Sequence, residues 1–237
     1  MSSKSRIAIL HYTSPPVMGG VESVIHAHSR EFILNGHDVT IIAGRGDSKY
    51  VGSGLPGGAN LYLIPDMYSL NPQILQMTDE LDRGNVPSEL HTLTNKLEVI
   101  LSPILRAFDS VFIHNLWTKH FNFPLTIALY RILESGQISN LINWCHDFTW
   151  GSPNSGHKVH PGFPWDLLRT FKSNVKYVVG SHHRQQMLAT LLVNFNDETE
   201  VSLMEKIQII PNGVSPENLI GLTNTGETLV NKFSLLT

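Results

Sequence analysis

The sequence predicts an α/β fold: a doubly wound, mostly parallel, Rossmann-like sheet of about seven strands with helices on both faces. Three observations predict it. Short apolar runs rich in valine and isoleucine recur along the chain, and amphipathic helical patterns lie between them. Several runs are apolar on both faces, as strands covered on each side should be. The first unit has the order strand, glycine turn, helix and strand, which is typical of parallel sheets.

The first predicted unit forms the beginning of the chain. An apolar strand over 7–12 meets a turn that contains Gly19 and Gly20, an amphipathic helix follows over 21–35, and a second strand covers 39–43. A helix that starts at a glycine turn directs free N–H groups and the positive end of its dipole toward the crevice. We expect this corner to be uncovered and to favour a phosphate or another anion.

Further predicted strands and helices alternate along the rest of the chain. Their alternation places the ligand crevice of such a sheet at the carboxyl ends of the strands. Long loops at 44–58 and 149–164 are of the kind that often carries function. The remaining predicted strands cover 60–64, 110–114, 141–145, 175–179 and 207–210, and the remaining predicted helices cover 88–107, 121–134, 165–172 and 182–192.

The composition argues against several classes of protein. The net charge of −3, without a long basic run, gives no support to a nucleic-acid partner. Contact with a membrane surface is left open without support, and no apolar run approaches the length of a spanning helix. Cys145 is the single cysteine, so an intrachain disulfide is excluded. These features predict a soluble cytoplasmic protein.

Five short motifs lie in order between about residues 6 and 214. They are Pro15-Pro16…Gly19-Gly20-Val21-Glu22, Asn35-Gly36-His37-Asp38-Val39-Thr40, Asn143-Trp144-Cys145-His146-Asp147, Val178-Val179-Gly180-Ser181-His182 and Pro211-Asn212-Gly213-Val214. Together they resemble glycosyltransferase family 4, whose members have the GT-B fold of two Rossmann-like domains. The resemblance implies that residues 1–214 form the N-terminal, acceptor-side domain. Residues 215–237 would then be a linker toward a C-terminal donor-binding domain that this chain lacks.

The resemblance implies roles for particular residues. Gly19 and Gly20 would form the loop that approaches the donor diphosphate, because glycine lets a backbone come close to a ligand. A tight turn that serves only packing is the alternative. His146, at the carboxyl end of a predicted central strand, would contact the transferred sugar near its reactive carbon and is the candidate catalytic residue. Asn212 and Gly213 would shape the turn that crosses between the domains.

A second group of residues could border the acceptor side of the cleft. His114 and Asn115 end a predicted strand, Glu22 lies in the first turn of the first helix, and Asp147 follows His146. Each has a structural alternative. Glu22 would favour the helix dipole, Asn115 would cap the next segment, and His146 would be a satisfied structural histidine. Neighbouring residues on a strand point to opposite faces, so Asp147 is not an obvious partner of His146.

No metal and no cofactor are predicted. Twelve histidines invite a zinc site, but no suitably spaced pair has a convincing third ligand, and His26 and His28 diverge on their helix. The sequence contains no Asp-x-Asp. Residues 52–57 match a dinucleotide fingerprint, but the strand before it and the helix after it are missing. The nucleotide-sugar is expected as a substrate.

The leading hypothesis is the acceptor-side half of a retaining, metal-independent glycosyltransferase. It would transfer a sugar from a nucleotide-sugar to a hydroxyl acceptor, with a separate donor-domain subunit as a further partner. The alternative is a non-catalytic or degenerate protein that binds a sugar or a partner through the same cleft face. A non-hydrolysing sugar epimerase of the same two-domain plan is weaker, because it needs the same missing half.

Overall fold

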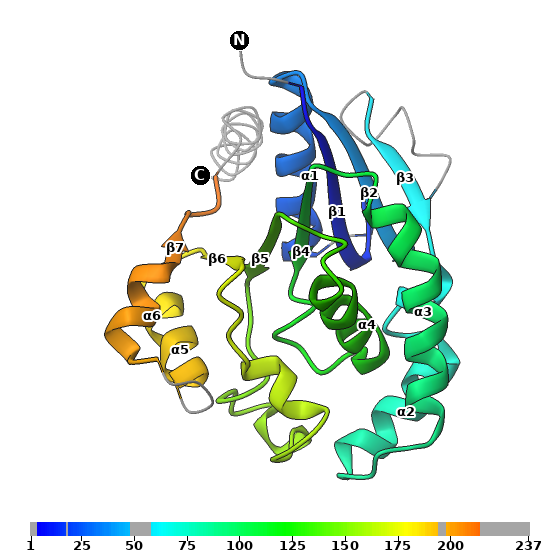
Figure 1. Cartoon of the computed structure of the whole chain (residues 1–237), viewed down its shortest axis with the longest axis vertical. Coiled ribbons are helices and arrows are strands. Elements are labelled where there is room, and N and C mark those ends of the chain that lie inside the picture. Colours follow the sequence, from blue (N-terminus) through cyan, green and yellow to red (C-terminus); the bar gives the residue numbers. More distant parts are fainter. Residues whose placement is uncertain (1–3, 18, 48–57, 194–197, 214–237) are drawn as a thin grey trace, which may run out of the picture.

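A parallel sheet forms the centre of the molecule. The computed structural model describes residues 4–17, 19–47, 58–193 and 198–213. Within them the strands follow the order β3-β2-β1-β4-β5-β6-β7, and each neighbouring pair is parallel (Figure 1). The predicted fold class is confirmed, and the predicted strands differ from the observed ones only at their ends. The strands are β1 (Arg6–Thr13), β2 (Asp38–Arg45), β3 (Asn60–Leu63), β4 (Ser110–His114), β5 (Leu141–Cys145), β6 (Val175–Val179) and β7 (Ile207–Ile209).

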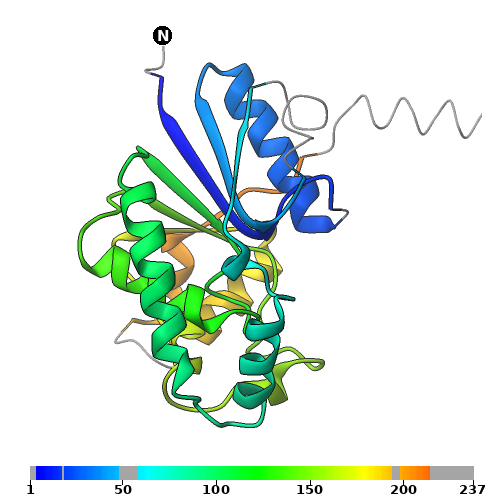
Figure 2. The same ribbon diagram turned by 90° about the vertical axis from the view of Figure 1, so that its right-hand side faces the viewer.

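Helices cover both faces of the sheet. The crossover from β1 to β2 and the crossover from β3 to β4 run in opposite directions, so right-handed connections place their helices on opposite faces. Accordingly α1 lies on one side and α3 on the other (Figure 2). Within the described residues, no helix is both long and apolar enough to cross a membrane. The α-helices are α1 (Gly20–Leu34), α2 (Pro72–Asp82), α3 (Glu89–Leu105), α4 (Phe123–Glu134), α5 (His182–Val193) and α6 (Glu200–Lys206).

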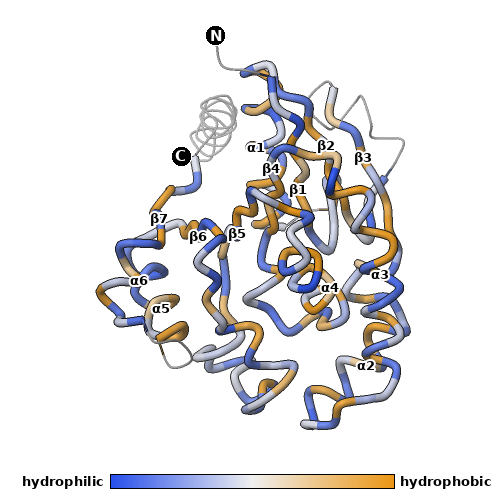
Figure 3. The backbone as a smooth tube through the Cα atoms, in the orientation of Figure 1, coloured by the Kyte–Doolittle hydropathy of each residue, from blue (hydrophilic) through white to orange (hydrophobic). Residues whose placement is uncertain are grey.

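Side-chain alternation along the strands gives each face of the sheet its own core. On β1, Ala8 and Leu10 pack with α3 and α4, whereas Ile7 and Ile9 pack with Ile25 of α1. All five residues are buried. The apolar colour in Figure 3 gathers along α4 and the central strands, where these cores lie. Burial of this apolar surface fixes the strand ends that carry the site.

The predicted helix at 165–172 is wrong. The chain forms only a short 3-10 helix there, Trp165–Arg169. The Tyr130 hydroxyl donates to the carbonyl oxygens of Leu167 at 2.7 Å and Thr170 at 3.2 Å. These contacts tie the 3-10 turn to α4, and the Leu167 carbonyl also accepts the Thr170 N–H at 3.4 Å within the turn.

The predicted loop at 44–58 begins too early. Gly44 and Arg45 belong to β2, and Arg45 pairs with Thr13 of β1. A Cβ at Gly44 would collide with the backbone of Tyr68, so this close approach requires glycine. The fingerprint-like residues 52–57 and the predicted linker 215–237 lie outside the described residues.

Candidate functional site

Several predicted site residues collect at the carboxyl edge of the sheet, where β1 lies beside β4. The chain passes from β1 to β2 on one side, while β4 and β5 lie on the other. Such a switch point is where open α/β sheets bind ligands. Because β4 ends at His114 and β5 ends at Cys145, the residues His114, Asn115 and His146 share this edge.

The rings of His114 and His146 contact each other. Nδ1 of His114 lies 3.0 Å from Nε2 of His146, and the stacked rings have centroids 5.3 Å apart. His114 is fully buried and His146 is partly exposed. Burial lowers the pKa of His114 well below its usual range and lowers the pKa of His146 to about 4. Both rings are therefore neutral near pH 7.

Asn115 holds the backbone around His146. Its side-chain oxygen accepts the N–H of His146 at 2.8 Å and the N–H of Asp147 at 3.0 Å. Its own N–H donates to the carbonyl of Trp144 at 3.1 Å, and its φ of 60° lies in the left-handed region. Asn115 therefore fastens the loop after β5 to the end of β4, a structural role different from the predicted cap.

The first turn of α1 is not bare, contrary to expectation. The carboxylate of Glu22 folds back over Gly19, and a Cβ at Gly19 would collide with its Oε2. The Thr13 hydroxyl donates to Glu22 Oε1. Gly20 differs, because a Cβ there would meet nothing within 4 Å. Both glycines are exposed, but the Glu22 carboxylate lies beside Gly19, on the side where a Cβ would be, and nothing occupies the corresponding side of Gly20.

His11 connects this helix start to the pair of histidines. It is buried on β1, and its Nδ1 lies 2.9 Å from the carbonyl oxygen of His114, to which it must donate. Its Nε2 lies 3.8 Å from Glu22 Oε1. Burial lowers the pKa of His11, although the carbonyl and the carboxylate oppose the shift. Gly19, Glu22, His11, His114 and His146 therefore form one contiguous series.

His28 of α1 was set aside in the sequence analysis, yet it joins this cluster. Its ring meets Trp144 edge-on with centroids 4.3 Å apart and lies 5.5 Å from His114. Burial lowers the pKa of His28 to about 4. His26 and His28 do diverge. His28 follows Val24 and Ile25 at the spacing of one helix face, and this pattern indicates that His28 lies on the buried face of the helix. In the part of the chain that the structure describes, no three His, Cys, Asp or Glu side chains form a metal-holding group.

The other predicted residues lie outside this series. Asp147 forms an ion pair with Arg184 of α5 at 3.1 Å, and both side chains are well exposed. Asn212 and Gly213 follow β7 and are exposed. Cys145 is buried, which raises the pKa of its thiol and excludes it as a nucleophile.

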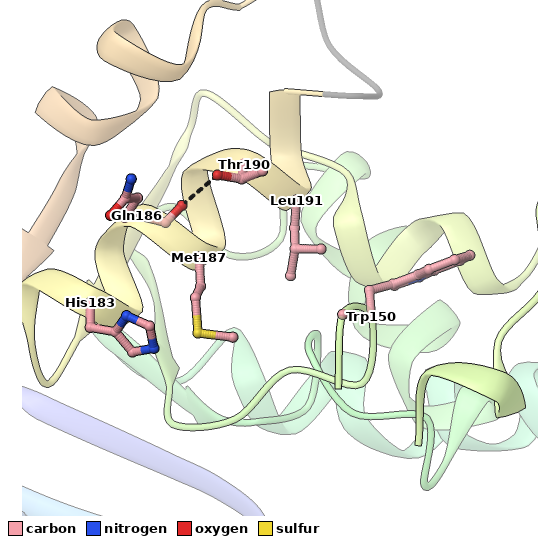
Figure 4. A pocket seen from close by; sticks show the side chains of 7 residues that line it. Trp150, His183, Gln186, Met187, Thr190 and Leu191 are labelled. Carbon is pink, nitrogen blue, oxygen red and sulfur yellow. Dashed lines mark hydrogen bonds between the residues drawn. The ribbon is translucent and has the colours of Figure 1, made fainter. Parts of the chain in front are cut away.

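A separate hollow of about 300 Å³ lies between α5 and the loop after β5 (Figure 4). Met187 and Leu191 of α5 and Trp150 of the loop give it apolar walls. Trp150 is held in place, because Arg169 stacks 3.6 Å from its ring centroid and its Nε1 donates to Trp165 at 3.1 Å. The predicted site residues do not line this hollow.

Comparisons with known proteins give structural likeness only. No family model matches the sequence, and no curated protein matches it. One similar solved structure is an α-glucosyltransferase in complex with UDP-glucose and DNA containing an abasic site. The two sequences are 12% identical, and the TM-score is 0.47. The alignment covers 90% of this chain and 44% of that chain. Another is UGT89C1 of Arabidopsis thaliana, with 12% identity, coverage of 94% and 55%, and a TM-score of 0.44. The chain spans about half the length of these two structures.

Proposed function

We propose that this chain is the acceptor-side half of a retaining, metal-independent glycosyltransferase of the GT-B type. The observation that supports this proposal most is the contiguous series from Gly19 to His146 at the switch point of the sheet. It brings the predicted diphosphate loop and the predicted sugar-contacting imidazole to one edge. The sugar would pass from a nucleotide-sugar to a hydroxyl acceptor. The donor-binding half would come from a further domain or from a separate subunit.

The helix start supplies the electrostatic part of this proposal. A carboxylate over Gly19 repels a diphosphate placed there, so the phosphate oxygens would meet the backbone at Gly20. The N–H groups and the positive dipole end of α1 would stabilise the charge that the leaving diphosphate acquires. That diphosphate would itself take the proton of the acceptor hydroxyl in a front-face displacement.

His146 supplies position and hydrogen bonding in this proposal. Because its ring is neutral and its backbone is fastened by Asn115, it offers a fixed polar atom to a sugar oxygen. A fixed contact of this kind contributes to catalysis by holding the reactants in a productive orientation. The loops at 44–58 and 149–164 would set the identity of the acceptor.

The test uses the full chain with UDP-glucose as a probe. In ¹H–¹⁵N spectra recorded with a candidate donor-domain subunit present, we expect UDP-glucose to shift the amide of Gly20 and the ring signals of His146. With a candidate donor-domain subunit and an acceptor panel, we expect release of UDP that His146→Ala lowers at least tenfold. Transfer at an unchanged rate in His146→Ala, or shifts confined to residues away from this edge, would refute the proposal.

The position of Glu22 favours a second candidate, a non-catalytic sugar-binding protein. Its carboxylate lies beside Gly19, one of the two glycines that the resemblance assigns to the diphosphate, and its negative charge opposes an anion there. Such a protein would bind a free sugar at this edge but release no UDP from UDP-glucose with any partner. Glu22→Gln separates the candidates, because only a diphosphate site should gain affinity for UDP when this negative charge is removed.

A further inference from the structure

We propose that His114 is a positioning residue whose Nδ1–H donates to Nε2 of His146. This bond fixes His146 as the Nδ1–H tautomer, which presents an N–H donor to an oxygen atom of the ligand. The inference rests on the proposed function only for the identity of that oxygen, on a sugar or a phosphate. The tautomer itself follows from contacts within this chain.

The contact between the two rings needs one donor and one acceptor. The nitrogen atoms lie 3.0 Å apart, which is a hydrogen-bond distance. Each neutral imidazole carries one N–H and one lone pair. Either His114 donates from Nδ1, or His146 donates from Nε2, and each choice fixes the remaining nitrogen of both rings.

The surroundings of His114 favour donation from its Nδ1 to His146. Its Nε2 is buried and has no hydrogen-bond partner among the described residues. If His146 donated, this Nε2 would carry the hydrogen, and a buried N–H without a partner costs about 1–3 kcal/mol. If His114 donates, only a lone pair is left there, and acceptors without a partner are tolerated better than donors. The ring of Trp144 lies nearly parallel to His114 with centroids 6.0 Å apart, so this side is filled.

Donation from His114 decides which nitrogen of His146, Nδ1 or Nε2, carries the hydrogen. With Nε2 accepting from His114, the single hydrogen of the neutral ring is on Nδ1. The bond of Nε2 to His114 and the stacking of the two rings oppose a turn of the His146 ring. His146 therefore donates from Nδ1 and cannot accept a proton there. This chemistry suits hydrogen bonding to a ligand oxygen and excludes a general base at that atom.

Long-range ¹H–¹⁵N correlation spectra of the full chain labelled with ¹⁵N-histidine test the proposal, because they distinguish protonated from unprotonated ring nitrogens. His146→Gln assigns the signals. We expect a protonated Nδ1 and an unprotonated Nε2 at His146. Protonated Nε2 in the parent protein would overturn the proposal, whether or not any variant of His114 folds.

Two variants test the role of His114. His114→Asn can keep an N–H near the position of Nδ1, and we expect it to preserve the tautomer of His146. His114→Phe removes the donor, and we expect the Nδ1–H population to fall at least twofold; an unchanged population would overturn the proposal. His91→Phe, at an exposed ring beside Phe163, is the matched control. Failure of UDP-glucose to bind when a donor-domain subunit is present would count against the proposed function and leave the tautomer result standing.

Discussion

The side-chain oxygen of Asn115 accepts the backbone N–H of His146 at 2.8 Å and so joins the ends of β4 and β5. The same oxygen accepts from Asp147 at 3.0 Å. Asn115 also adopts a φ of 60°, which asparagine tolerates better than most residues. Two requirements therefore meet at one position, one for backbone conformation and one for a hydrogen-bond acceptor.

Substitutions at Asn115 separate these two requirements. Asn115→Gly keeps the left-handed conformation but loses the acceptor, and we expect the free energy of unfolding to fall by about 1–3 kcal/mol. Asn115→Ala adds backbone strain of about 1–2 kcal/mol. Asn115→Asp keeps an acceptor and should cost least of the three. Urea denaturation measures the series, and an alanine variant as stable as the parent would show that the loop does not depend on this contact.

The buried histidines predict a loss of stability in acid. His28 and His146 have pKa values of about 4 in the fold against 6.5 in an unfolded chain. As the pH falls below about 6.5, the unfolded state binds protons first, so stability is full above that pH and decreases down to about pH 4. The expected slope approaches 1.4 kcal/mol per pH unit for each ring, by order of magnitude.

Urea midpoints at several pH values in this window measure that slope. The double variant His28→Phe with His146→Gln should reduce this slope, because two of the buried rings are removed; His11, His114 and His120, whose pKa values burial also lowers, remain. Equal slopes for the parent and the double variant would mean that these rings are not the groups that titrate. His28→Phe alone should fold well, since His28 Nδ1 is a buried polar atom without a partner among the described residues.

The central strands β1, β2, β4, β5 and β6 could be predicted from the sequence because they are mostly buried apolar runs. The edge strand β3, in contrast, is largely exposed and was identified by its apolar residues and its place in the alternation. The helix α2 was not predicted, although Asn71 caps it and Pro72 occupies its first turn, both of which are start signals. Its buried apolar residues Ile74, Met77 and Leu81 lie at i, i+3 and i+7, a further helix signal in the sequence, and they pack in a small cluster apart from the sheet. At 165–172 the helical pattern was present, but the chain forms a 3-10 turn that the Tyr130 hydroxyl joins to α4, a tertiary contact that no local pattern reveals.

The site could be predicted only in part, for a similar reason. Strand-end positions identified His114 and His146, because the carboxyl edge of a sheet follows from the order of elements. Their ring contact depends on β4 and β5 being neighbours and on side-chain rotamers. The contact of His11 with His114 also depends on which strands are neighbours. In the sequence His11 is only one residue of an apolar run, and its role becomes visible when β1 lies beside β4. The fold of Glu22 over Gly19 is likewise a rotamer choice.

Gly19 and Gly20 should differ in their tolerance of alanine. A Cβ at Gly19 would displace the Glu22 carboxylate and its bond with Thr13, whereas a Cβ at Gly20 meets nothing within 4 Å. We expect Gly20→Ala to be as stable as the parent or more stable by a few tenths of a kcal/mol, and Gly19→Ala to lose about 1 kcal/mol. Thermal unfolding compares the pair. Equal stability of both variants would mean that Glu22 moves at no cost.

Thr149 anchors the long loop after β5. It is fully buried, its hydroxyl oxygen accepts the N–H of His120 at 3.1 Å, and it lies 3.0 Å from His120 Nδ1. Thr149→Val keeps the shape but leaves these groups without a partner, and we expect a loss of about 1–3 kcal/mol in urea unfolding. Thr190→Val, on the exposed face of α5, is the matched control and should stay within about 0.5 kcal/mol. A loss no larger than that of the control would remove Thr149 as an anchor.

Gly20→Val tests whether a ligand approaches the start of α1. A Cβ at Gly20 meets nothing within 4 Å and the residue is exposed, so we expect the variant to fold, and thermal unfolding verifies this. If phosphate oxygens meet this backbone, two added methyl groups would block them, and UDP-dependent transfer in the reconstituted enzyme should fall at least tenfold. Gly20→Ala, with one methyl group, should lie between the parent and the valine variant. Kinetics with UDP-glucose measure the series alongside thermal unfolding. Parental turnover in a folded Gly20→Val variant would reduce this loop to a packing turn and would place the diphosphate elsewhere.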